Sequence, residues 1–396
     1  MTITAAMRMI SESEAGLLRK FATNFAWAGV RASLAHRSRL VRGEFFPPFL
    51  FLSLTDRCNL TCRGCWVSTG RPRDLTFEVA DRVIGAARLK GSRFFGLLGG
   101  EPLLYDRLFD LIAKHPDCYF QVFTNGTLLT PSHVREMRRL KNVTPLISIE
   151  GLEKESDVRR GATGVYEAAM EALKLCRQAR LITGVATSVC RTNISEVATE
   201  AFIEDMAGRG AHYLWYYIFR PVGPMPSAEL ALEGREIRML REFIVDARRR
   251  SPLFIIDAYW DHLGRAVCPA AAGMSHHVNA AGDVEPCPPV QFACDSLAGG
   301  AAVAEVFQRS GFLRRFRNMA SRATSGCILM EDPAALERFL ASEGARDTSA
   351  RGTALDELSQ MCPRPSHNIN GESIPEKSLL YRVAKKQWFF GMGAYG

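Results

Sequence analysis

Short apolar runs alternate along the chain with segments of helical hydrophobic periodicity. The runs, rich in β-branched and aromatic residues, are Phe51–Thr55, Phe94–Leu98, Tyr119–Thr124, Pro145–Ile149, Thr183–Val189 and Tyr213–Phe219. The amphipathic segments, with a period of about 3.6 residues, are Phe77–Leu89, Tyr105–Lys114, Ser132–Leu140, Val165–Ala179, Ile194–Gly208 and Ala228–Arg250. Continuous apolar strands separated by helices indicate parallel strands covered on both faces. The pattern predicts an α/β fold of six β/α units, either a partial barrel or an open doubly wound sheet, with its chemistry at the carboxyl ends of the strands.

The pattern changes near residue 258. From Trp260 to Cys362 the chain is rich in Gly, Pro, Ala and Cys, and amphipathic helices are expected only over Ala304–Met319 and Ala334–Glu343. We therefore predict a smaller cysteine-rich domain organised around a metal. The predicted divisions are a basic amphipathic extension over 1–47, the β/α region over 48–258, the cysteine-rich domain over 259–362 and a basic aromatic tail over 363–396.

Charge is concentrated at the two ends of the chain. The formal net charge is +8, and residues 1–43 hold seven Arg or Lys against two Glu, while 377–396 hold four basic residues and no acid. The remaining body is close to neutral, so we expect no nucleic-acid partner. No apolar stretch approaches the ~20 residues that span a bilayer, and the eleven cysteines are too sparse for a disulfide scaffold. A cytoplasmic protein is expected.

The basic ends also carry apolar stripes. Leu18, Phe21, Phe25, Ala28 and Ala32 recur at helical spacing, and Trp388–Phe390 repeat the aromatic chemistry after Lys385 and Lys386. A basic amphipathic helix of this kind can lie on an anionic membrane surface. The alternative is that both ends pack against the barrel as capping segments.

Three cysteines follow the first predicted strand: Cys58, Cys62 and Cys65. Their C-x3-C-x2-C spacing on a loop can direct three thiolates at one iron–sulfur cubane and leave the fourth iron without a protein ligand. A structural zinc site usually needs a fourth Cys or His, and none lies within twenty residues on either side. The loop therefore predicts a cluster with an open iron.

This loop resembles the signature of the radical S-adenosylmethionine (SAM) superfamily, over about residues 48–260. Segments at later strand ends are similar to the family's GGEP, TNG and S-x-D-G motifs, and the resemblance implies that they bind SAM; the residues concerned are Gly99, Gly100, Glu101, Pro102, Thr124, Asn125, Gly126, Ser148 and Glu150. The run Asp157–Gly161 resembles the D-x-x-R-G run. Gly64 departs from the family, which has an aromatic residue there against the adenine. The resemblance implies a partial TIM-type (β/α)6 barrel.

A second cysteine set resembles the start of the SPASM/twitch domains that hold auxiliary clusters. The segment from Gly282 to Cys287 matches that start, and Cys287 lies nineteen positions after Cys268. The dense later part of the full SPASM pattern is missing. The resemblance implies one auxiliary [4Fe–4S] cluster with four thiolate ligands, for which we favour Cys268, Cys287, Cys327 and Cys362, with Cys294 as the alternative fourth. His276 and His277 leave a zinc site open as an alternative.

The resemblance implies an oxidoreductase or transferase that cleaves SAM reductively and abstracts a substrate hydrogen with the 5′-deoxyadenosyl radical. It also implies an electron donor such as flavodoxin or ferredoxin. The basic apolar ends favour a small hydrophobic metabolite or lipid as substrate. Two alternatives remain open: a maturase that modifies a ribosomal peptide or protein, and a non-catalytic iron–sulfur or zinc protein.

Overall fold

Parallel strands form the centre of the molecule. The computed structural model describes residues 2–387, and in it the strands run in the order of the chain: β1 (Phe49–Ser53), β2 (Phe94–Leu98), β3 (Tyr119–Thr124), β4 (Val143–Ser148), β5 (Gly184–Val189), β6 (Tyr213–Ile218) and β7 (Phe254–Asp257). All neighbouring pairs from β1 to β7 are parallel. The six predicted strands are confirmed with bounds shifted by at most two residues, and β7 is an addition.

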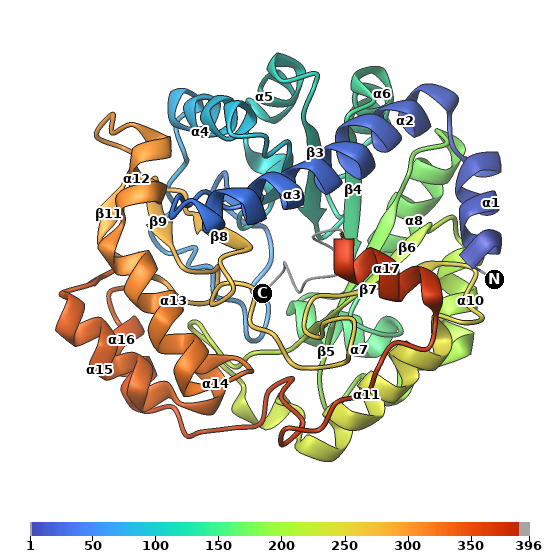
Figure 1. Cartoon of the computed structure of the whole chain (residues 1–396). Helices are drawn as coiled ribbons and strands as arrows, with labels where there is room; N and C mark the ends of the chain where they lie inside the picture. Colours follow the sequence, from blue (N-terminus) through green and yellow to red (C-terminus); the bar gives the residue numbers. More distant parts are fainter. Residues whose placement is uncertain (1, 388–396) are drawn as a thin grey trace.

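Helices cover the outer face of these strands, as Figure 1 shows. They are α4 (Phe77–Leu89), α5 (Leu108–Lys114), α6 (Pro131–Leu140), α7 (Glu153–Arg160), α8 (Val165–Gln178), α9 (Ile194–Val197), α10 (Glu200–Gly208) and α11 (Gly234–Ala247), with short 3-10 turns η2 (Pro102–Leu104) and η3 (Ala228–Leu230). The expected helix Ile194–Gly208 is broken because the Thr199 side chain accepts a hydrogen bond from the Phe202 amide and starts α10 there. The arrangement is the predicted partial barrel.

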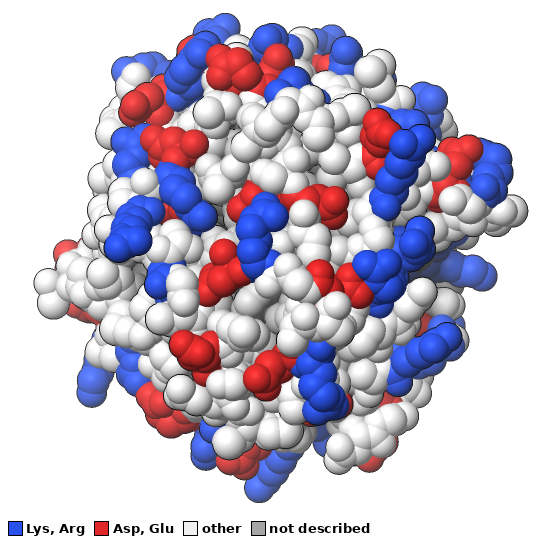
Figure 2. Space-filling model, turned by 90° about the vertical axis from the view of Figure 1, so that its left-hand side faces the viewer, with Lys and Arg blue, Asp and Glu red and all other residues white. Residues whose placement is uncertain are grey.

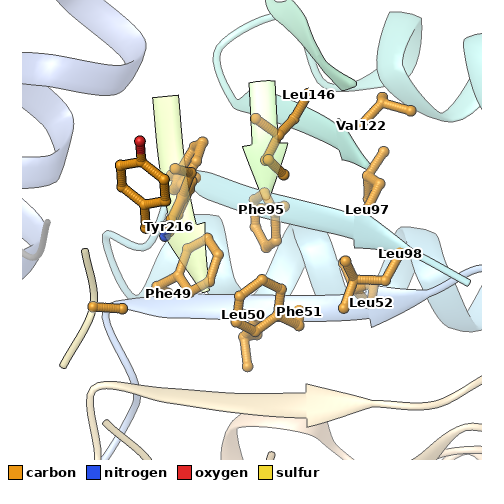
Figure 3. Packing of buried hydrophobic residues seen from close by; sticks show 14 of the residues in the cluster. Phe49, Leu50, Phe51, Leu52, Phe95, Leu97, Leu98, Val122, Leu146 and Tyr216 are labelled. Carbon is orange, nitrogen blue, oxygen red and sulfur yellow. The ribbon is translucent and has the colours of Figure 1, made fainter. Parts of the chain in front are cut away.

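The strands are buried on both faces, as their continuous apolar sequences require. In Figure 3, Phe49, Leu50, Phe51 and Leu52 of β1 lie among apolar side chains of the neighbouring strands. Each of these four is at most 2% exposed. Because the interior of the barrel is filled with apolar side chains, space for a ligand is confined to the ends of the strands.

The cysteine-rich region extends the barrel sheet. Strand β8 (Ser275–Val278) pairs in parallel with β1, with His276 opposite Leu50, and β9 (Asp283–Glu285) and β11 (Asp295–Ser296) follow in antiparallel order. The remaining elements are the β10 (Phe292–Ala293) and β12 (Arg346–Asp347) pair and the helices α12 (Val303–Arg309), α13 (Gly311–Ala323), α14 (Ile328–Glu331), α15 (Pro333–Glu343) and α16 (Ala354–Ser359). The expected helix Ala304–Met319 breaks at Ser310, whose hydroxyl caps α13.

The N-terminal helices lie across the barrel strands (Figure 1): α1 (Thr2–Glu12), α2 (Ala15–Lys20), the π-helical segment η1 (Phe21–Trp27) and α3 (Ala28–Val41). The ring of Phe25 is 4.6 Å from that of Phe94 and 5.5 Å from that of Tyr119, so much of the apolar stripe packs against the barrel. Trp27 stays 63% exposed. No helix within residues 2–387 is both long and apolar enough to cross a bilayer.

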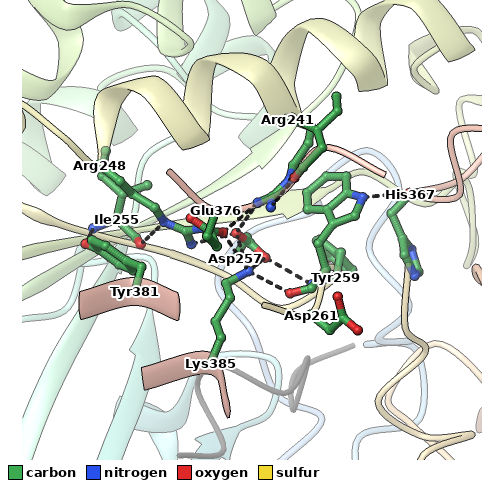
Figure 4. Close-up of polar contacts among 12 residues, drawn as sticks. Arg241, Arg248, Ile255, Asp257, Tyr259, Asp261, His367, Glu376, Tyr381 and Lys385 are labelled. Carbon is green, nitrogen blue, oxygen red and sulfur yellow. Dashed lines mark hydrogen bonds and ion pairs between the residues drawn. The ribbon is translucent and has the colours of Figure 1, made fainter. Parts of the chain in front are cut away.

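The C-terminal helix α17 (Leu379–Gln387) is anchored by buried ion pairs. Figure 4 shows Asp257, at the end of β7, beside Arg241, Arg248 and Lys385, with Glu376 in the same group. Each of these side chains is at most 2% exposed. Lys385 Nζ donates to the carboxylate of Asp257 at 2.9 Å. The predicted aromatic residues Trp388–Phe390 lie outside the described residues.

The outer surface carries charges of both signs. On the face with α12 and α15, Lys and Arg side chains are interspersed with Asp and Glu (Figure 2). This face offers no extended basic track of the kind that follows a phosphate backbone.

Candidate active site

A cavity of about 310 Å³ opens at the carboxyl ends of the strands. Its wall brings together most of the residues singled out from the sequence: Cys58, Cys62, Cys65, Gly99, Gly100, Thr124, Asn125, Ser148 and Glu150. Glu101, Pro102 and Gly126 lie behind this wall. The strand-end motifs therefore meet the cysteine loop at one cavity, although up to 92 residues separate Cys58 from Glu150 along the chain.

The cysteine loop is pressed against Gly99 and Gly100. The Gly100 amide donates to Thr55 O at 2.7 Å, and the Glu101 amide donates to Arg57 O at 2.8 Å. A Cβ atom on Gly99 would lie 2.4 Å from Thr55 O, and one on Gly100 would lie 2.2 Å from Arg57 O. Because such contacts are too short, only glycines let the two backbones approach this closely.

The three loop thiols face a cation. Arg160 Nη1 lies 3.8 Å from Cys62 Sγ. Burial raises the pKa of Cys58 to about 11 and that of Cys65 to about 12. These thiols must therefore lose protons to ligate iron, and Arg160 favours the charged form. The donor set, three thiols on one loop at a cavity, fits a cubane with one iron left open.

Glu101 is fully buried and holds the motifs together. Its carboxylate accepts hydrogen bonds from Thr124 Oγ1 at 2.8 Å, from the Asn125 amide at 2.8 Å and from the Leu103 amide at 3.1 Å. Burial raises its pKa, and these donors oppose that rise. Glu101 thus joins the turn after β2 to the turn after β3.

The turn after β3 is also tied to the cysteine loop. Asn125 Nδ2 donates to Asn59 Oδ1 at 3.0 Å, and Asn59 Nδ2 donates to Thr127 Oγ1 at 2.8 Å. Gly126 adopts a φ of 82°, in the left-handed region that favours glycine. The chain thereby fixes the position of this turn relative to Cys58.

Glu150 binds two groups that the sequence did not place in the site. Its carboxylate pairs with Arg160 and accepts a hydrogen bond from the Ser188 amide at 2.9 Å. Burial alone would lower the pKa of Arg160, but Glu150 and Cys62 raise it. Arg160 lies in the D-x-x-R-G run, which is the signal that could have identified it.

Phe219 fills the space beside Gly64. A Cβ atom on Gly64 would lie 2.1 Å from the Phe219 ring, and the Arg159 guanidinium lies over that ring, 4.6 Å from its centroid. All three residues line the cavity. An aromatic side chain from the residue after β6 therefore lies next to the glycine of the cysteine loop.

The second set contains three cysteines that lie together. Burial raises the pKa of Cys268 to about 11 and that of Cys287 well above its usual range, and in each case neighbouring Cys327 adds to the rise. Arg220 lines the cavity, and the nearby thiols of Cys327 and Cys287 help raise the pKa of its guanidinium. Three thiols and one cation fit an iron–sulfur cluster next to the cavity.

The fourth ligand of this set stays a prediction. Cys362 is exposed, and Cys294 is also exposed, with its thiol 3.7 Å from Glu343 O. His277 contacts Ser53 Oγ at 2.8 Å and Glu285 Oε2 at 2.6 Å, so both ring nitrogens are engaged. Within residues 2–387, no group of three or more His, Cys, Asp or Glu has the arrangement of a single-ion site.

Known proteins are similar to this chain in sequence. The model of the Radical SAM superfamily matches residues 52–205. The sporulation killing factor maturation protein SkfB of Bacillus subtilis is 29% identical over 231 residues, covering 55% of this chain and 54% of that protein. The AdoMet-dependent heme synthase of Methanosarcina barkeri is 29% identical over 178 residues, covering 43% and 51%. The chain spans about half the length of these relatives.

Solved structures share the fold. SuiB of Streptococcus suis bound to SAM superposes with a TM-score of 0.60 at 17% identity, covering 72% of this chain and 71% of that one. SuiB bound to its precursor peptide SuiA gives the same TM-score and identity. At this identity the likeness concerns the fold alone.

Proposed function

We propose that the chain is a radical SAM enzyme with its SAM-binding [4Fe–4S] cluster on Cys58, Cys62 and Cys65, since residues 52–205 match the model of the Radical SAM superfamily. The observation that carries the proposal is the cavity where these thiols meet the strand-end motifs. A reduced cluster held by these three thiolates would supply the one-electron chemistry that cleaves SAM reductively and generates a radical able to take a hydrogen atom from the substrate.

The chain's own residues position SAM in this proposal. Gly99 and Gly100 let the turn after β2 lie against the cysteine loop, Glu101 fixes the turn at Thr124 and Asn125, and Ser148 and Glu150 line the same cavity. Phe219 offers the adenine an aromatic face in place of the side chain that Gly64 lacks. Holding the reacting atoms in one geometry is the protein's main contribution to the rate.

We propose an auxiliary cluster on Cys268, Cys287 and Cys327. These three thiols are buried or half-buried, their proximity adds to the rise in the pKa values of Cys268 and Cys287, and the charge of Arg220 acts on the same group, which supports this proposal. Arg220 belongs both to this set and to the cavity wall, so the second cluster would lie beside the substrate.

For the substrate, the comparisons favour a peptide or a heme precursor over a lipid. The relatives are named for maturation of a killing factor and for heme synthesis. The favoured prediction of a small hydrophobic metabolite or lipid rested on the two basic apolar ends. Phe25 of the N-terminal stripe is buried against the barrel, and Trp388–Phe390 lie outside the described residues. We therefore propose modification of a peptide or of a heme precursor.

The test is a triple substitution of the cysteine loop. Anaerobically reconstituted protein should hold about eight irons, four per cluster, and Cys58→Ala/Cys62→Ala/Cys65→Ala should hold about four and form no 5′-deoxyadenosine. Cys294→Ala, at an exposed thiol outside both sets, is the control and should match the wild type. Continued SAM cleavage by the triple variant would overturn the proposal.

A further inference from the structure

The cavity wall carries more positive than negative charge. Four arginines line it, Arg63, Arg159, Arg160 and Arg220, whereas Glu150 is the one acidic residue among the described lining residues. Arg160 pairs with Glu150, and Arg63 pairs with Glu229 outside the cavity. Within residues 2–387, no carboxylate pairs with Arg159 or Arg220.

Arg159 is the more unusual of these two side chains. It is only 5% exposed, and its Nε and Nη1 atoms have no hydrogen-bond partner. Its guanidinium is held over the Phe219 ring, 4.6 Å from the centroid. A buried guanidinium with unpaired donors is costly, and stacking on Phe219 fixes its orientation at the cavity. The unpaired donors of this guanidinium favour an anion as their partner.

Tyr217 adds a second unpaired donor to the same cavity. Its hydroxyl is buried without a hydrogen-bond partner, and its ring is stacked on Trp215 at 5.3 Å. Tyr217 belongs to β6 and Phe219 follows that strand, and both line the same cavity as Arg159. A carboxylate can accept hydrogen bonds from both kinds of group.

The ion pairs and the charges of the proposed cofactors balance every arginine of the cavity wall except one. A resting [4Fe–4S] cluster on three thiolates carries one negative charge, and SAM carries one net positive charge from its sulfonium and ammonium groups against its carboxylate. The charges of SAM and of the cluster on the cysteine loop therefore cancel, and a cluster on the second set balances Arg220. Arg159 then keeps its positive charge beside a cavity wall with no further acid.

We propose that Arg159 binds a carboxylate of the substrate, with the Tyr217 hydroxyl as the second donor. The inference rests on the proposed function for the identity of the cavity's other occupants. Two kinds of substrate carry such a carboxylate. A tetrapyrrole carries it on its propionate side chains, and a peptide carries it on an acidic side chain or at its C-terminus.

Benzoate and benzamide test the inference, because they have nearly the same shape and differ in charge. Titrations by calorimetry use holoenzyme loaded with SAM, without reductant. Wild type should bind benzoate about tenfold more tightly than benzamide, since charged hydrogen bonds to a buried guanidinium are strong. Arg159→Gln should abolish this preference, and Tyr217→Phe should reduce it about threefold. Arg63→Gln, which removes an arginine already paired with Glu229, should retain it.

Iron content and SAM affinity are measured in every variant to separate this inference from the proposed function. If the wild type did not bind SAM, the proposed function itself would be contradicted. Normal SAM binding with equal affinities for benzoate and benzamide would overturn the inference alone. A drop in SAM affinity in Arg159→Gln without a change in benzoate preference would also overturn it, because the anion would then be the SAM carboxylate.

Two further ligand pairs distinguish the two kinds of substrate. Coproporphyrin is compared with its tetramethyl ester, and an acidic pentapeptide with its fully amidated form. The substrate class that supplies the carboxylate is identified by its ligand pair. In that pair the free acid should bind the wild type about tenfold more tightly than the neutral form, and Arg159→Gln should remove this difference. If neither free acid gained affinity from its carboxylates in the wild type, a substrate carboxylate at Arg159 would be contradicted.

Discussion

The two cysteine sets are assembled in different ways. The first comes from a single loop, between Cys58 and Cys65, and is held by glycine contacts with the next strand end. The second joins Cys268, Cys287 and Cys327 from separate loops of a region that extends the barrel sheet through β8. The first set's arginine, Arg160, is paired with Glu150, whereas Arg220 at the second set has no carboxylate partner among the described residues. A locally encoded set is fixed by its spacing, and a dispersed set depends on the fold around it.

The largest expected effect is on iron content, which should fall when a cysteine of the second set is replaced and stay unchanged when an exposed cysteine is replaced. Cys327→Ala should lower the iron content from about eight to about four per chain, because two thiolates do not hold a cubane. Cys362→Ala and Cys294→Ala should both keep about eight, since both thiols are exposed whereas Cys268, Cys287 and Cys327 are not. An iron assay with Mössbauer spectroscopy measures this. Loss of iron in Cys362→Ala would make the second set a four-cysteine site after all.

The next effect is on the stability of the protein, through the buried ion pairs of Asp257. Asp257 faces Arg241, Arg248 and Lys385 in full burial, and the chain continues from it toward Cys268. Asp257→Asn should destabilise the protein by about 3–5 kcal/mol, because buried cations lose their partner. Asp246→Asn, which breaks the exposed pair with Lys377, should cost less than about 1 kcal/mol. Thermal unfolding compares the two variants, and equal shifts would contradict the role of the buried network.

A smaller effect is expected at the first set. Glu101→Ala removes the acceptor of three hydrogen bonds that position Thr124 and Asn125. Charged hydrogen bonds of this kind contribute roughly 1.5–3 kcal/mol, so SAM affinity should fall about tenfold to a hundredfold. The cluster should remain, because Glu101 ligates no iron. Equilibrium dialysis with SAM and an iron assay check both points, and unchanged affinity would remove Glu101 from SAM positioning.

The smallest effect is a difference in acid response. The paired cations lower the pKa of Asp257 against the effect of burial, so its contribution to stability is lost as the pH falls below about 4. Burial raises the pKa of Glu101, so stability gains from its protonation as the pH falls toward its usual range. Compared with wild type, Asp257→Asn should lose stability less steeply on acidification, and Glu101→Gln more steeply. Melting curves between about pH 3 and pH 6 test the signs.

The sequence predicted the barrel and the first set well because both are local patterns. Each apolar run became a buried strand, and the spacing of Cys58, Cys62 and Cys65 placed them on one loop. The helix α7 was missed because its charged sequence has no apolar face. Choosing Cys362 as fourth ligand relied on its place at the end of the predicted domain, and the fold leaves that residue exposed.

The unpaired charge of Arg159 could not be read from the sequence either. Two consecutive arginines end α7. One pairs with Glu150, and the other lies over Phe219. Their different surroundings depend on contacts with β6 and with the segment after β4, which adjacency in the sequence does not reveal.

Electron paramagnetic resonance of a protein with only the first cluster tests the central claim most directly. In Cys268→Ala/Cys287→Ala/Cys327→Ala, the reduced spectrum arises from the Cys58 loop alone. If an open iron binds SAM there, adding SAM should shift the signal of the reduced cluster. A spectrum that SAM leaves unchanged would show that SAM does not reach the cluster, and would contradict the account.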